Sequence, residues 1–143
     1  MSKRSLPRLN TAELGEDSQD LILHIATVLL GASMVDAVPR NREIRLIRHT
    51  LNRGLRVEAS QTRNVMRKAL RKIIQGQGYA QIGAALDKLR ETLNLKQRVS
   101  LYSALFSIVM ADGHVDTAEK YYLELVAEKL ELANEKLYTS HVR

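Results

Sequence analysis

The chain has 143 residues, which suffices for one domain with a single core and is short for two. With 45% hydrophobic and 27% charged residues, two prolines and seven glycines, its composition excludes a disordered or fibrous protein. The net charge is +6, and the absence of cysteine excludes disulfides, thiolate metal ligands and cysteine redox chemistry. A chain without cysteine fits a reducing cytosol, so we expect a cytoplasmic location.

The sequence predicts helices from residue 18 onward. Residues 1–17 are polar, lack the apolar run of a signal peptide and predict a flexible tail before a helical domain over 18–143. The most apolar run, 21–35, is shorter than the roughly 20 residues of a bilayer span and predicts a buried helix. We expect an all-α fold in one domain. Breaks at glycine, proline and asparagine predict about seven helices, at 19–36, 41–53, 58–75, 79–93, 96–111, 117–131 and 134–139.

The sequence also repeats itself at an offset of 76 positions. The apolar stripes that follow residues 36 and 112 correspond, with the spacing of a helix face turned toward a core. The repeat predicts two related helical hairpins joined by two middle helices. The matched pairs are Leu29 with Leu105, Met34 with Met110, Asp36 with Asp112, and Glu43 with Glu119.

The second turn of this repeat reads ADGHVDTAE over residues 111–119, between two apolar helical patterns. This run resembles the signature of the TerB-like family, which is associated with bacterial tellurite resistance. The first copy, VDAVPRNRE over 35–43, resembles a degenerate equivalent, with Ala37 replacing the glycine and Arg40 standing where the second copy has Asp116.

The resemblance covers residues 20–140 and carries its own expectations. It implies a single domain of about seven helices with a pseudo-twofold arrangement and with acidic residues near the turns. It also implies a role in sensing or binding cations, within a stress-response complex near the inner membrane.

The carboxylates of the second turn admit two interpretations. In the first, Asp116 and Glu119 form a capping box and Gly113 ends the preceding helix in a left-handed conformation. This leaves Asp112 unexplained, because a carboxylate in the last turn of a helix opposes the helix dipole. In the second, the turns hold a hard divalent cation, calcium or magnesium, although the spacing differs from an EF-hand loop. The candidate metal ligands are then Asp112, Asp116, Glu119, Asp36 and Glu43.

Charge is segregated along the chain. Residues 40–72 contain eleven lysines and arginines against two glutamates, whereas residues 111–135 contain seven acids against two lysines. Arg63, Arg67 and Arg71 recur every four residues and predict one exposed stripe of a helix, with Lys68 and Lys72 beside it. This basic face is either a solvated surface or a binding face for a protein or an anionic membrane. The acidic end also allows copies to associate head to tail.

Nucleic acid is a less expected partner of this face, because residues 40–72 contain no tyrosine, phenylalanine or tryptophan on which bases could stack. Catalysis is not expected, since the four histidines are dispersed and no nucleophile motif or phosphate loop occurs.

The sequence therefore predicts a non-enzymatic, TerB-like interaction or sensing domain of a bacterial stress response, with a divalent cation at the acidic turns as an option. Its partner would be a protein, which could be membrane-associated, so the expected location is cytoplasmic or peripheral to the inner membrane. The alternative is a basic helical adaptor for nucleic acid or an anionic membrane, with purely structural acidic turns.

Overall fold

The computed structural model describes residues 18–34, 41–54, 58–75, 78–113 and 115–132. These residues form helices joined by short connections and contain no strand, which confirms the predicted all-α class. A 3-10 turn at Met110–Asp112 follows the fifth α-helix. The α-helices are α1 (Ser18–Met34), α2 (Asn41–Gly54), α3 (Ala59–Gln75), α4 (Gly78–Thr92), α5 (Leu95–Val109) and α6 (Thr117–Lys129).

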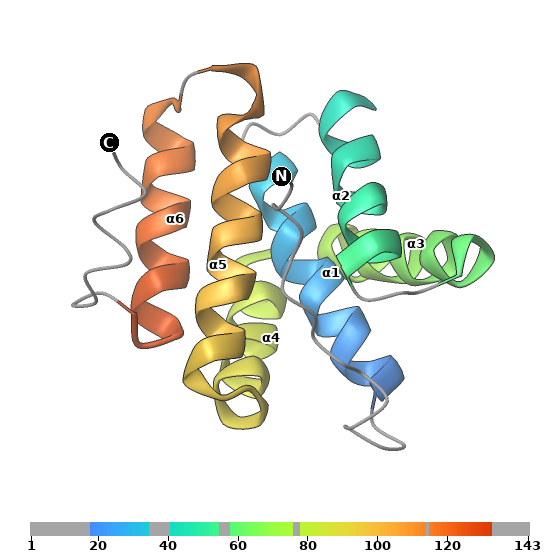
Figure 1. Cartoon of the computed structure of the whole chain (residues 1–143), viewed down its shortest axis with the longest axis horizontal. Helices are drawn as coiled ribbons and strands as arrows, with labels where there is room; N and C mark the ends of the chain where they lie inside the picture. The colour runs from blue at the N-terminus through green and yellow to red at the C-terminus, as the bar shows by residue number, and fades with distance from the viewer. Residues whose placement is uncertain (1–17, 35–40, 55–57, 76–77, 114, 133–143) are drawn as a thin grey trace.

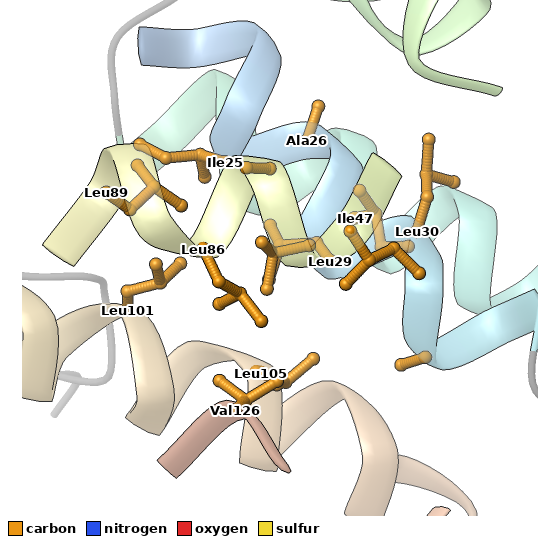
Figure 2. Packing of buried hydrophobic residues seen from close by; sticks show 14 of the residues in the cluster. Ile25, Ala26, Leu29, Leu30, Ile47, Leu86, Leu89, Leu101, Leu105 and Val126 are labelled. Atoms are coloured by element: carbon orange, nitrogen blue, oxygen red, sulfur yellow. The ribbon is translucent and has the colours of Figure 1, made fainter. Parts of the chain in front are cut away.

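Helix α1 occupies the centre of the molecule and contacts α2, α3, α4 and α5 (Figure 1). Between residues 21 and 33 only Leu23 and His24 are not buried, which is the pattern of a helix surrounded by others. Figure 2 shows Leu29 of α1 facing the same interior as Leu86 of α4 and Leu105 of α5. The predicted buried helix is therefore the centre of the core.

Helix α6 is tied to α1 by a buried hydrogen bond. The hydroxyl of Tyr122 donates to the carbonyl oxygen of Val28 at 2.6 Å. The tyrosine reaches this carbonyl across Gly31, where an added Cβ would lie 2.8 Å from Tyr122 Cζ, 2.9 Å from Ile82 Cδ1 and closer still to Tyr122 Oη. Gly31 is therefore required by the close approach of α6 to α1.

The far end of α6 is held by Arg98 of α5. Its guanidinium donates to the carbonyl oxygens of Leu93, at 3.2 Å, and Leu130, at 2.6 Å. Helix α6 stops here because Glu131 adopts a left-handed conformation, with φ of 61°. The amide of Leu132 then donates to the carbonyl of Ala127 at 2.7 Å, which satisfies a carbonyl that the helix would otherwise leave unpaired.

The six described α-helices agree with the predicted ones to within two residues at each end. The largest differences are at the ends of α5, which gives way to a 3-10 turn before Gly113, and of α6, which gives way to the left-handed Glu131. The predicted end of the first helix, at residue 36, lies outside the described residues. The predicted tail at 1–17 and the predicted seventh helix at 134–139 lie outside the described residues. None of the described helices is both long and apolar enough to cross a bilayer.

The 76-residue offset of the sequence repeat is also found between helices of the structure. Helix α6 starts 76 positions after α2, so Glu43 and Glu119 are both the third residue of their helix. Both are buried, with 9% and 4% of their surface exposed. The element order, a helix pair, two helices and a second pair, is the predicted one. The geometry of the first turn, 35–40, lies outside the described residues.

Candidate functional site

The acidic turn between α5 and α6 is compact. After the 3-10 turn, Gly113 takes a φ of 95°, a left-handed conformation that glycine adopts without a steric cost. Its amide donates to the carbonyl oxygen of Met110 at 2.9 Å and closes the 3-10 turn that follows α5. The predicted role of Gly113 is therefore confirmed.

Asp116 and Glu119 form the predicted capping box at the start of α6. The amide of Glu119 donates to Asp116 Oδ1 at 2.8 Å, and the amide of Asp116 donates to Glu119 Oε1 at 3.2 Å. Two amides that the helix leaves unpaired are thus satisfied by carboxylates, which also favour the positive end of the helix dipole. The capping interpretation accounts for both side chains without a ligand.

The metal interpretation gains less support from the described residues. Among them, no group of three or more histidine, aspartate or glutamate side chains is arranged to hold a metal ion. Asp116 and Glu119 come together in the capping box, where each carboxylate accepts a hydrogen bond from a backbone amide. Asp36 and the side chain of Asp112 lie outside what the structure describes, so the convergence of the proposed ligands with Glu43 stays a prediction.

The basic face of α3 is exposed as predicted. We use this name for Arg63, Arg67, Lys68, Arg71 and Lys72, all of which are exposed. Arg67 Nη1 donates to Asn64 Oδ1 at 3.3 Å, and none of the five forms an ion pair with a carboxylate in the described part of the chain. Within the described part of the chain, the face therefore presents five positive charges to solvent without a paired carboxylate.

Helix α2, which packs against α3, also carries exposed positive charge. Thr62 Oγ1 donates to Asn52 Oδ1 at 2.5 Å and joins α3 to α2. Arg45 and Arg53 of α2 are exposed, and Glu58 is the one exposed acid among the described residues between 41 and 75. Exposed basic side chains thus occur on two helices that pack against each other.

The outer face of α6 has the opposite charge. Tyr121 is 67% exposed, and Glu124 and Glu128 are exposed beside it without an ion pair in the described structure. Other acids nearby are paired, since Asp87 lies 3.1 Å from Lys129 Nζ and Glu131 lies 3.5 Å from Arg90.

Sequence reasoning missed two buried polar features. The first is the Tyr122 hydroxyl, whose pKa is raised far above its usual range by burial. The second is the burial of Glu43 and Glu119. Their matched positions in the repeat, each near the start of a helix, were a signal from which this shared burial could have been predicted. His24 lies in the apolar run that predicted a buried helix and is partly buried; its pKa is lowered by this burial and by Lys72 and Lys88, against the opposing effect of Asp20.

The fold and these surfaces define a small all-α domain with an acidic helical turn and a separate basic helix face. The family model described as tellurite resistance protein TerB matches residues 23–139, and the chain belongs to the TerB family. No curated protein and no solved structure matches the chain. The predicted TerB-like membership is confirmed, and the match covers both turns of the internal repeat.

Proposed function

We propose that this chain is a non-enzymatic interaction domain of a bacterial stress response of the tellurite-resistance type, and that it binds an anionic partner through the basic face of α3. The observation that carries the proposal is the exposure of five basic side chains with no carboxylate partner in the described structure. The proposed site of action is the cytoplasm, where the partner is soluble or associated with the inner membrane.

The chemistry of the face suits carboxylate or phosphate groups as ligands. Three of the five side chains are arginines, whose planar guanidinium groups bind a carboxylate or a phosphate through two parallel hydrogen bonds. Helix α3 carries no aromatic residue, so the face lacks the platforms on which single-stranded nucleic acid stacks. An acidic protein surface is therefore the proposed ligand, with nucleic acid and anionic lipid as the competing polyanions.

The test compares two triple variants that lose the same charge. The face variant carries Arg63→Gln, Arg67→Gln and Arg71→Gln, and the control carries Lys88→Gln, Lys96→Gln and Lys120→Gln, all exposed positions. The probes are fluorescent poly-glutamate, an RNA oligomer and vesicles that contain anionic lipid. Both variants should keep the wild-type melting temperature, since surface substitutions usually change stability by less than about 0.5 kcal/mol.

We expect the face variant to bind poly-glutamate about tenfold more weakly at low salt, with little change in the control. Equal losses in both variants would show that only net charge matters and would contradict the proposal. Stronger binding to RNA or to vesicles than to poly-glutamate would favour the basic-adaptor alternative.

The second candidate function is divalent cation binding at the acidic turn. The observation in its favour is that the capping box already holds two carboxylates, those of Asp116 and Glu119, side by side on one turn. Oxygen ligands of this kind suit calcium or magnesium. Ion-dependent thermal melting tests this function separately from the basic face.

A further inference from the structure

We infer that a stripe of α3 that includes Arg63 and Arg67 of the basic face binds the outer face of α6 in a second copy of this chain, as an antiparallel helix pair. The inference rests on the proposed function, because it identifies the anionic partner of the basic face as the chain itself.

One side of the contact is a stripe along α3. Arg63, Arg67, Leu70 and Ile74 follow one another at spacings of four, three and four residues, which places them in a line along one side of a helix. The two arginines are exposed, Leu70 is partly buried, and Ile74 is 64% exposed. The stripe is thus basic at its start and apolar at its end.

The other side is a stripe with the same spacing along α6. Thr117, Tyr121, Glu124 and Glu128 are all exposed, and Tyr121 is 67% exposed. This stripe is uncharged at its start and acidic at its end. Each stripe covers about 17 Å of helix at 1.5 Å per residue, so the two match in length.

The two stripes align residue by residue in either orientation, but only the antiparallel one places the basic end of α3 against the acidic end of α6. In that orientation the four facing pairs are Arg63 with Glu128, Arg67 with Glu124, Leu70 with Tyr121, and Ile74 with Thr117. Two facing pairs are then of opposite charge, and two bring apolar surface together.

The parallel orientation would set Leu70 against Glu124 and Ile74 against Glu128, and both carboxylates would lose hydration without gaining a partner. The antiparallel register has one unfavourable neighbour, Arg71 opposite Lys120. Both are exposed and flexible residues beside the seam, where they keep their contact with water.

The placement of the two helices decides between contact within one copy and contact between copies. Figure 1 shows α6 at one end of the longest axis of the molecule and α3 extending toward the other. The two faces therefore meet only between molecules, in a heterologous contact that leaves one face free at each end of a pair. A single helix pair is smaller than a standard stable interface, so the association is weak and salt-sensitive.

The experiment uses sedimentation velocity over a range of concentrations, at about 20 mM salt and again at about 500 mM salt. The α3 variant carries Arg63→Gln and Arg67→Gln, and the α6 variant carries Glu124→Gln and Glu128→Gln. The control variant carries Glu91→Gln and Lys96→Gln, two exposed positions outside both stripes.

We expect wild type and control to assemble beyond dimers at low salt and to disperse at high salt. Each stripe variant should associate about tenfold more weakly. An equal mixture of the two variants should form dimers and stop there, because each mixed pair retains one intact α3 stripe and one intact α6 stripe.

Wild-type protein that stays monomeric at low salt would overturn the inference, as would assembly that neither stripe variant weakens. The triple face variant separates this failure from that of the proposed function. If wild type is monomeric yet the basic face still binds poly-glutamate, only the second copy is the wrong partner; if neither interaction occurs, both proposals fail.

Discussion

Replacing Gly31 by alanine tests how closely α6 is fitted against α1. In most helix interiors this change is favourable by about 1 kcal/mol, because alanine is the better helix former. Here the new methyl group would lie 2.8 Å from Tyr122 Cζ and 2.9 Å from Ile82 Cδ1, and nearer still to the Tyr122 hydroxyl. Gly83 of α4 is the matched control, since a Cβ there meets no atom within 4 Å.

Two effects oppose the gain in helix propensity at Gly31. Overpacking of a core costs about 1–3 kcal/mol, and displacing Tyr122 would also remove its buried hydrogen bond to Val28, which contributes about 0.5–1.5 kcal/mol. We therefore expect Gly31→Ala to lower the free energy of unfolding by about 1–3 kcal/mol, and Gly83→Ala to raise it by up to about 1 kcal/mol.

The assay is urea unfolding of both alanine variants, of Tyr122→Phe and of Gly31→Ala/Tyr122→Phe. Removing the hydroxyl relieves the nearest contact of the new methyl group, so the double variant should lose less stability than the sum of its single changes, by about 0.5–1 kcal/mol. The reasoning is refuted if Gly31→Ala stabilises the protein as much as Gly83→Ala, or if the two changes at the contact are additive.

Other predictions concern the acidic turn and the polar groups of α1. Asp112→Asn should leave wild-type stability nearly unchanged in thermal melts if the turn is only structural, and should abolish stabilisation by millimolar calcium or magnesium if the turn binds a cation. Asp116→Ala should cost about 1 kcal/mol in urea unfolding through loss of the cap, with or without these ions. Because burial lowers the pKa of His24, the unfolded chain takes up this proton first as the pH falls. Stability should then decline below about pH 6.5, and the decline should be smaller in His24→Gln; identical pH profiles would contradict this. Ser33 Oγ is buried without a hydrogen-bond partner in the described structure, so Ser33→Ala should be neutral or should raise the unfolding free energy by about 1 kcal/mol.

The sequence indicated those features that depend on neighbouring residues. The periodicity of the apolar residues predicted that Arg63, Arg67 and Arg71 are exposed, because apolar residues every three or four positions determine which side of a helix is buried. The Asp116 and Glu119 capping box was predictable for the same reason, since both partners lie within one turn.

Features that join distant parts of the chain had no such signal. The hydrogen bond from Tyr122 to Val28 spans 94 positions, and its requirement for Gly31 follows from a helix crossing that no local pattern encodes. The contact from Arg98 to Leu130 spans 32 positions and depends on where α6 ends. The separation of the α3 and α6 faces likewise became apparent only from the arrangement of the helices (Figure 1).

The hydrogen bonds that hold α6 along its whole length affect how the domain opens locally. The first turn of α6 is capped by Asp116 and Glu119. In its middle, Tyr122 donates a hydrogen bond to Val28 of α1, and at its end Arg98 of α5 donates one to the Leu130 carbonyl oxygen. A helix that is free at one end frays from that end, and its terminal amides exchange with solvent hydrogen long before its centre. With its start capped, its middle bonded to α1 and its end bonded to Arg98 of α5, α6 should instead exchange its terminal amides at nearly the rate of its central ones, because they open in the same cooperative event.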